Sequence, residues 1–206
     1  MSDRSQAALA TFFDRQAAVP ELCRFTPEER ARLQVLLDRW DIRPGTRVLE
    51  PGCGGGRLTE LLAQAVGPTG RVIACDLSPG MLRAARARRL PAWVRLLRAE
   101  AARLPLPAGS VDLVVCFCVF PHFTRPEQVL AELARALSPG GTLWICHLLG
   151  RCEVNALHRR AGPPVANHYR PSPWRLRKLL AAAGLAVRSL QDDDDGFCVL
   201  ALNDRH

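Results

Sequence analysis

Between Arg47 and Leu148 the sequence alternates short apolar runs with amphipathic segments, and this alternation constrains the fold more than any other feature of the chain. The apolar runs, typical of strands, are Arg47–Glu50, Arg71–Asp76, Trp93–Arg98, Val111–Phe120 and Thr142–Leu148. The amphipathic segments, typical of helices, are Arg57–Val66, Pro79–Leu90 and Pro126–Leu137, the last followed by a turn at Ser138–Gly141. Strands separated by helices of about 10–15 residues predict a parallel sheet with both faces covered. Right-handed crossovers then give a doubly wound α/β fold.

The segment before the first strand predicts helices. A leading helix would place three apolar side chains on one face, namely Leu9, Phe12 and Phe13. Thr26, followed by Pro27 and Glu29, has the sequence of a capping box, which predicts a second helix that ends near Trp40. We expect residues 1–43 to form N-terminal helices that cover a ligand site and residues 44–206 to form the ligand-binding part, in a single domain overall.

The segment after the fifth strand predicts the end of the sheet. We expect an irregular stretch over 149–172 and then a helix over Trp174–Ala183. Leu185–Leu190 and Phe197–Leu202 predict a hairpin around a solvated acidic turn, Asp192–Asp195. The complete prediction is a mostly parallel, seven-stranded sheet that closes with an antiparallel hairpin strand.

Composition is typical of a globular chain, because 48% of the 206 residues are hydrophobic and 23% are charged. Lys and Arg outnumber Asp and Glu by 28 to 20, which gives a net charge of +8. Only Lys178 is a lysine, so the excess of arginine indicates a compositional bias, and nucleic acid is a less favoured partner than a small molecule. The chain has no run of 18 apolar residues, and its first 20 residues lack the apolar core of a signal peptide. We therefore expect no membrane span and a cytoplasmic location.

A glycine-rich turn joins the first strand to the helix that follows it. The sequence is Glu50-Pro51-Gly52-Cys53-Gly54-Gly55-Gly56, and glycines at such a turn let a ligand approach the backbone closely. A dinucleotide fingerprint would need a small residue where Arg57 stands, which disfavours a nicotinamide cofactor. Glu50, at the end of the strand, suits a cationic ligand better than a pyrophosphate.

Two further acids end the second and third strands. Asp76, in Ile73–Ser78, lies at the distance from the glycine turn at which an acid can accept both hydroxyls of a ribose. Glu100, in Ala99-Glu100-Ala101, is placed to accept from the amino group of an adenine. Either acid alone is more typical of a cap or a loop, but together with the glycine turn they predict a nucleoside-binding site.

Together these motifs resemble the class I S-adenosylmethionine-dependent methyltransferases, in particular the ubiquinone/menaquinone-biosynthesis-like (methyltransferase type 11) branch. Val48–Gly56 is similar to the first motif of that family, with Glu50 in place of Asp, and Leu137–Gly141 is similar to its L-x-P-G-G motif. A third stretch, Ala99–Asp112, is similar to the motif between strands three and four. The resemblance implies S-adenosylmethionine as cofactor and in-line methyl transfer to a small molecule. The expected cofactor contacts are Glu50, Gly52, Cys53, Gly54, Gly56, Asp76, Leu77, Glu100, Ala101 and Cys116.

The acceptor side is predicted from histidines beyond strands four and five. His122, His147 and His158 are the candidate catalytic residues, and His168 lies in the same region. Arg151, Asn155 and His158 would share one face of a helix that covers the pocket. No metal is expected, because the eight cysteines form no C-x-x-C pair and the histidines have no metal-binding spacing.

An apolar acceptor pocket is also expected. Its lining would come from Phe12, Phe13, Phe117, Phe120, Phe123 and Trp174. Cys116 and Cys118 share one face of the fourth strand, where core packing is favoured over a role in methyl transfer. The competing readings are a methyltransferase that acts on RNA or protein, and a non-catalytic cofactor-binding module. The sequence leaves the oligomeric state open.

Overall fold

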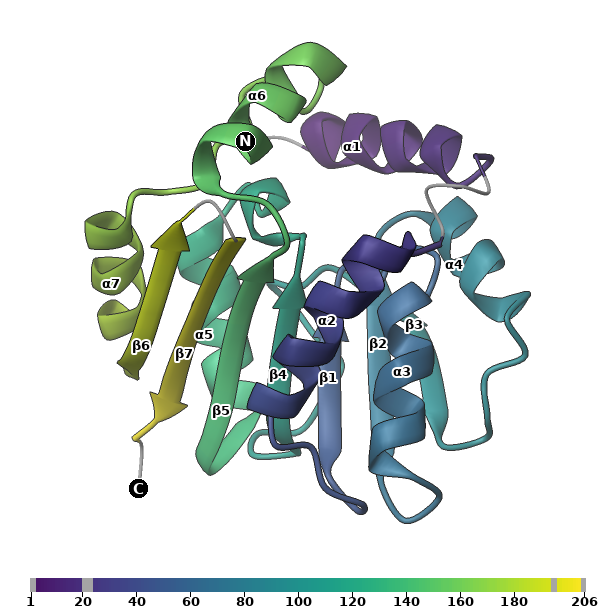
Figure 1. Ribbon diagram of the computed structural model, residues 1–206, viewed down its shortest axis with the longest axis vertical. Helices are drawn as coiled ribbons and strands as arrows, with labels where there is room; N and C mark the ends of the chain where they lie inside the picture. Colours follow the sequence, from purple (N-terminus) through teal and green to yellow (C-terminus); the bar gives the residue numbers. More distant parts are fainter. Residues whose placement is uncertain (1–2, 20–23, 194–195, 205–206) are drawn as a thin grey trace.

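Seven strands form one sheet in the order β3-β2-β1-β4-β5-β7-β6, with helices on both faces (Figure 1). The computed structural model describes residues 3–19, 24–193 and 196–204. The strands are β1 (Arg47–Pro51), β2 (Arg71–Asp76), β3 (Val94–Arg98), β4 (Val111–Phe117), β5 (Leu137–His147), β6 (Leu185–Asp193) and β7 (Gly196–Asn203). The helices are α1 (Asp3–Gln16), α2 (Pro27–Arg39), α3 (Arg57–Val66), α4 (Pro79–Arg86), α5 (Pro126–Ala136), α6 (Arg151–Ala161) and α7 (Pro173–Ala182), and a 3₁₀ turn, η2, spans Phe120–His122.

The five strands β1 to β5 are parallel, whereas β7 runs antiparallel to both β5 and β6. The predicted fold class is therefore confirmed. The strand order reverses between β1 and β4, which is the position where open α/β sheets bind ligands beyond the carboxyl ends of their strands. Figure 1 shows α1 lying across that edge of the sheet.

Two hydrophobic clusters fix the layers on either side of the sheet. On one face α2 and α3 pack against β1 and β2, with Leu33 and Leu62 fully buried. On the other face α5 and α7 pack against β4 and β5, with Leu133 and Leu176 fully buried. Alternating side chains of each strand supply both clusters, so the strand ends are held rigidly beneath the site.

The turn expected at Ser138–Gly141 is absent, because β5 begins at Leu137 directly after α5. Leu137 pairs with Val111 of β4, and the Asn203 side chain donates to the carbonyl groups of Leu137 and Ser138. These long-range contacts keep the segment in the sheet, although its Ser-Pro-Gly-Gly sequence is typical of a turn.

Two other expectations change, at the end of α4 and at Asp192. The helix α4 ends at Arg86 rather than Leu90, and Arg89 has a left-handed backbone with φ of 53°. Within the stretch 149–172, the helix proposed to carry Arg151, Asn155 and His158 is present as α6. Asp192 is not a solvated turn residue, because it belongs to β6 and pairs with the buried side chain of Arg170 at 2.6 Å. The rest of the predicted acidic turn, residues 194–195, lies outside the described residues, as does Cys23.

Within the described residues, no helix is both long enough and apolar enough to span a bilayer.

Candidate active site

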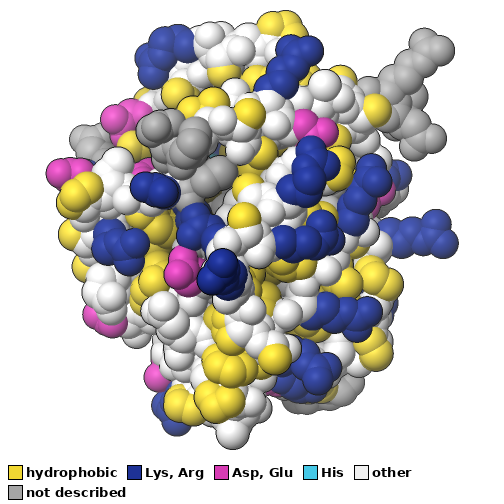
Figure 2. Space-filling model, turned by 90° about the vertical axis from the view of Figure 1, so that its right-hand side faces the viewer, with side chains coloured by type: hydrophobic (Ala, Val, Ile, Leu, Met, Phe, Trp, Pro, Cys, Tyr) yellow, Lys and Arg dark blue, Asp and Glu magenta, His cyan; other side chains and the backbone are white. Residues whose placement is uncertain are grey.

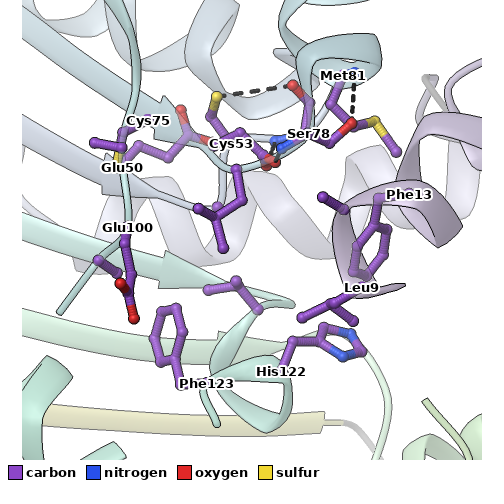
Figure 3. A pocket seen from close by; sticks show the side chains of 18 of the residues that line it. Leu9, Phe13, Glu50, Cys53, Cys75, Ser78, Met81, Glu100, His122 and Phe123 are labelled. Atoms are coloured by element: carbon purple, nitrogen blue, oxygen red, sulfur yellow. Dashed lines mark hydrogen bonds between the residues drawn. The ribbon is translucent and has the colours of Figure 1, made fainter. Parts of the chain in front are cut away.

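A cavity of about 230 Å³ opens at the carboxyl ends of β1, β2 and β4, where the strand order reverses. Its walls come from the glycine turn, the ends of β2 and β3, the segment after β4, and α1. In Figure 3 the carboxylates of Glu50 and Glu100 lie on one side of the cavity, and His122 lies on the other with Leu9 and Phe13 of α1. The cavity therefore has a polar side and a partly aromatic side.

The glycine turn is held against β2 by backbone hydrogen bonds. The amides of Gly52 and Cys53 both donate to the carbonyl oxygen of Cys75, at 2.7 and 3.0 Å. Gly52 has φ of +70°, and a Cβ atom placed there would lie 2.2 Å from a methyl carbon of Val119. Only glycine fits this position, for both steric and backbone reasons.

Two carboxylates, the buried Glu50 and the partly buried Asp76, face the polar side of the cavity. Glu50 is 3% exposed and accepts a 2.6 Å hydrogen bond from the Thr59 hydroxyl, and burial raises its pKa to about 8. Asp76 accepts from the amides of Gly54 and Ser78, yet burial raises its pKa as well. Charge repulsion from Asp76 raises the pKa of Glu50 further. Such a pair favours a ligand that brings positive charge or hydroxyl donors.

Glu100 is held by side chains from two elements. Gln6 of α1 and Arg125 both donate to its Oε1, the latter at 2.5 Å, and Oε2 has no hydrogen-bond partner among the described residues. Glu100 can therefore still accept from a ligand through Oε2.

The far end of α1 is tied down in the same way. Asp14 accepts from the Ser78 hydroxyl at 2.6 Å and from the Gly80 amide at 2.7 Å, at the start of α4. These bonds lower the pKa of Asp14. The helix α1 is thus anchored at both ends over the cavity.

Three histidines gather at the aromatic side. The His122 ring lies 5.1 Å from the Phe13 ring and 4.8 Å from the His158 ring, centroid to centroid. Its Nδ1 is 3.0 Å from Nδ1 of His168. Burial, followed by the other imidazoles, lowers the pKa of His122 well below its usual range. Among the described residues, no group of three or more His, Cys, Asp or Glu side chains is arranged to hold a metal ion.

Residues 49–145 match a family described as "Methyltransferase domain". This match assigns residues 49–145 to a methyltransferase domain. The sequence-based resemblance to S-adenosylmethionine-dependent methyltransferases is confirmed, and the cofactor of such a domain is S-adenosylmethionine.

The methyltransferase domain has curated relatives that are longer than this chain. Over 120 residues it is 43% identical to an uncharacterized 37.1 kDa protein in transposon TN4556 of Streptomyces fradiae, covering 57% of this chain and 34% of that protein. Over 108 residues it is 37% identical to the ubiquinone/menaquinone biosynthesis C-methyltransferase UbiE of Ectopseudomonas mendocina, covering 50% of this chain and 42% of that protein. The chain therefore spans less than half the length of these relatives.

A solved structure matches the methyltransferase domain over most of both chains. It is the crystal structure of a SAM-dependent methyltransferase from Aquifex aeolicus, with a TM-score of 0.70 and 26% sequence identity. The match covers 86% of this chain and 93% of that chain. The matched share of this chain is larger than the segment 49–145 that matches the family.

Most of the residues expected to contact the cofactor line the cavity of the methyltransferase domain. They are Glu50, Gly52, Cys53, Gly54, Asp76, Leu77, Glu100 and Ala101. Gly56 does not line the cavity, because it is the N-cap residue of α3, with φ of 76°, and packs against Ala85 of α4. Cys116 does not line it either, because its side chain lies fully buried in the core on the α5 face. Cys118, two residues on, lines the cavity instead.

Among the candidate catalytic residues, only His122 lines the cavity. His158 is in contact with His122 and donates through Nδ1 to the backbone carbonyl of His168, at 2.5 Å. His147 is buried at the end of β5, its Nε2 has no hydrogen-bond partner, and burial lowers its pKa to about 3. These two histidines therefore lie behind His122 rather than in the cavity.

The polar face predicted for α6 does not point into the cavity. Arg151 lies 3.6 Å from Asp192, and the Asn155 side chain accepts from the Arg170 amide at 3.0 Å. Both residues hold the segment after α6 and the closing hairpin in place.

The expected aromatic lining is correct in part, since Phe13, Phe117 and Phe123 line the cavity. Trp174 is 66% exposed on α7, and neither Phe12 nor Phe120 lines the cavity. Sequence reasoning missed Gln6 and Arg125, although Gln6 lies one helical turn before Leu9 on the predicted apolar face.

Proposed function

We propose that this protein transfers the methyl group of S-adenosylmethionine to a small acceptor that is partly hydrophobic or aromatic. The observation that carries the proposal is the division of one cavity into a side with the carboxylates of Glu50 and Asp76 and a side lined by Leu9, Phe13 and His122. The first side suits a cationic nucleoside and the second suits an apolar acceptor. A cytoplasmic location fits the buried, unpaired cysteines Cys75 and Cys116, which are typical of a reducing compartment.

The residues present fit the cofactor. The backbone from Gly52 to Gly55 would lie along it, Asp76 would accept from the ribose hydroxyls, and Oε2 of Glu100 would accept from the adenine amino group. A positive charge on the ligand would also stabilise the ionised form of Glu50, which burial disfavours. When bound, S-adenosylmethionine supplies a methyl group on a sulfonium that is already activated for displacement. The main task of the chain is then to position two reactants, which can contribute up to about 7–11 kcal/mol to lowering a barrier.

The aromatic side would position the acceptor and exclude water. Leu9, Phe13 and Phe123 provide the apolar walls, and α1 closes the cavity between its two anchored ends. His122 is the residue placed to take a proton from an acceptor, since it lines the cavity and burial keeps its ring neutral near pH 7. His158 would position His122 from α6.

The test is transfer of label from methyl-labelled S-adenosylmethionine into a fractionated cell extract. Asp76→Ala serves as the control, because it removes the ribose acceptor from the cavity. Label in the small-molecule fraction of the wild-type reaction supports the proposal and gives a compound to identify. Label confined to precipitated RNA or protein, or no label above the Asp76→Ala control, contradicts it.

A second candidate acceptor is RNA, and one observation favours it. Figure 2 shows many arginine side chains and few acidic ones on the side of the molecule with α3, α4 and β3. The exposed arginines of α4 and β3 include Arg83, Arg86, Arg95 and Arg98. Such a surface could bind phosphates, in which case affinity for RNA would fall steeply as salt is raised.

A further inference from the structure

The three histidines at the aromatic side touch one another rather than carboxylates. His122 comes from η2, His158 from α6 and His168 from the segment that follows α6. The His122 and His168 rings are 5.3 Å apart, centroid to centroid, with their Nδ1 atoms 3.0 Å apart. Among the described residues, no carboxylate forms a hydrogen bond or ion pair with any of the three rings. A protonated ring here would therefore have no anionic partner to stabilise it.

The hydrogen bonds restrict where the protons lie. A backbone carbonyl only accepts, so His158 must carry its proton on Nδ1 to donate to the His168 carbonyl. Between His122 and His168, only one of the two facing Nδ1 atoms can carry a proton. If His122 is the donor, its Nε2 has a free lone pair and can act as a base. If His168 is the donor, Nε2 of His122 carries a proton and cannot.

The two rings of this pair differ in their position relative to the cavity. Both rings are partly buried, but His122 lines the cavity and His168 does not. The titratable groups that face His122 are His147 from β5, His158 and His168, and each of them lowers its pKa further. A proton gained by His122 is therefore unstable there, and Nδ1 of His168, 3.0 Å from Nδ1 of His122, is placed to accept a proton from that ring.

We propose that His122 and His168 form a proton relay, and that the acceptor is a nucleophile whose O–H or N–H proton is lost on methylation. This inference rests on the proposed function. The acceptor oxygen or nitrogen bonds to the methyl carbon as the carbon–sulfur bond breaks, and that electron pair stays on sulfur. The acceptor proton passes to Nε2 of His122, the Nδ1 proton of His122 passes to Nδ1 of His168, and His168 releases its Nε2 proton to water. Exchange with water restores both rings when the cavity opens.

The first test measures tautomers in the wild-type protein, with no acceptor needed. Nitrogen-15 labelling of histidine, read by long-range nitrogen–proton NMR near neutral pH, distinguishes Nδ1–H from Nε2–H rings. The relay requires Nδ1–H on His122 and Nε2–H on His168. The opposite pair of tautomers overturns the relay, because His122 would then be a donor toward the cavity. Asn substitution at either position assigns the signals.

The second test measures methyl transfer into the extract fraction by the His168→Gln variant. The relay predicts about a tenfold lower kcat with unchanged KM for S-adenosylmethionine, and partial rescue by added imidazole. Tyr169→Phe is the matched control, because Tyr169 is the exposed neighbour and does not contact His122. Unchanged kcat in His168→Gln overturns the relay. If the wild-type protein labels nothing, the proposed function fails, whereas the tautomers still report on the relay.

Discussion

The cofactor side and the acceptor side of the cavity are built in different ways. On the cofactor side, Glu50 and Asp76 lie at the ends of β1 and β2, and Glu100 follows the end of β3, the next strand of the sheet. Backbone amides of one short turn complete the surface. On the acceptor side, Phe13, His122 and His158 come from three helical elements that are far apart in the sequence. A site made of strand ends and backbone is specified locally, whereas a site made of converging side chains depends on packing between distant segments.

The largest expected effect tests the backbone dependence of the cofactor side. Gly52→Ala places a methyl group 2.2 Å from Val119 at a φ of +70°, so we expect cofactor binding to be lost in calorimetry. Gly140→Ala is the matched control, because Gly140 has φ of +73° with nothing within 4 Å of its Cβ position. It should cost only about 1–2 kcal/mol of stability, measured by thermal unfolding. An equal loss of binding in both variants would show that the missing side chain of Gly52, and the close packing it allows against Val119, are not what cofactor binding requires.

The next prediction tests whether substitutions on the acceptor side change turnover without changing cofactor affinity. His122→Ala and His158→Ala should leave the affinity for S-adenosylmethionine near that of wild type, because neither lies on the cofactor side. The turnover of His122→Ala should fall by about a hundredfold, which is at the low end for loss of a general base. The turnover of His158→Ala should fall by a smaller factor. Calorimetry and labelled transfer measure the two quantities. Full activity in both variants would remove these histidines from the acceptor site.

A smaller effect is expected at Asp76. Asp76→Ala should weaken S-adenosylmethionine binding at least about tenfold without unfolding the chain, because it removes a hydrogen-bond acceptor from the cavity. Asp76→Asn keeps one oxygen for the Gly54 or Ser78 amide and should bind with intermediate affinity. Unchanged affinity of the alanine variant in calorimetry would contradict the ribose role.

The smallest effect is a change in pH dependence. Burial raises the pKa of Glu50 from 4.5 to about 8, so the folded protein holds a proton that the unfolded chain releases. Stability from this group is therefore full below about pH 4.5 and falls as pH rises toward about 8. The difference in melting temperature between wild type and Glu50→Gln, followed across this window, isolates the effect from that of the histidines. A constant difference would mean that Glu50 is not protonated in the free protein.

The contrast between the two sides also explains what sequence reasoning could reach. Alternating strands and helices fixed the order of the fold, and strand ends followed by Gly52, Asp76 and Glu100 located the cofactor side. Gln6 was not predicted, because its role depends on where α1 lies over Glu100, and no local pattern encodes that placement.

Local propensity failed where tertiary contacts opposed it. Ser138–Gly141 has a turn sequence, yet Asn203 holds the carbonyls of this region within the sheet. The prediction that Cys116 and Cys118 share one face of the fourth strand is wrong, because β4 ends at Phe117 and Cys118, with φ of 54°, packs against the cluster on the other face of the sheet. A single left-handed residue therefore moved the cavity contact by two positions.

The anchoring of α1 links the opening of the cavity to its contents. Gln6 binds the carboxylate proposed for the adenine, and Asp14 binds the loop that follows the carboxylate proposed for the ribose. On the proposed function, lifting α1 away from the cavity would break the contacts of Gln6, of Asp14 or of both. The strength of these contacts would then govern how fast spent nucleoside is released, independently of the rate of methyl transfer.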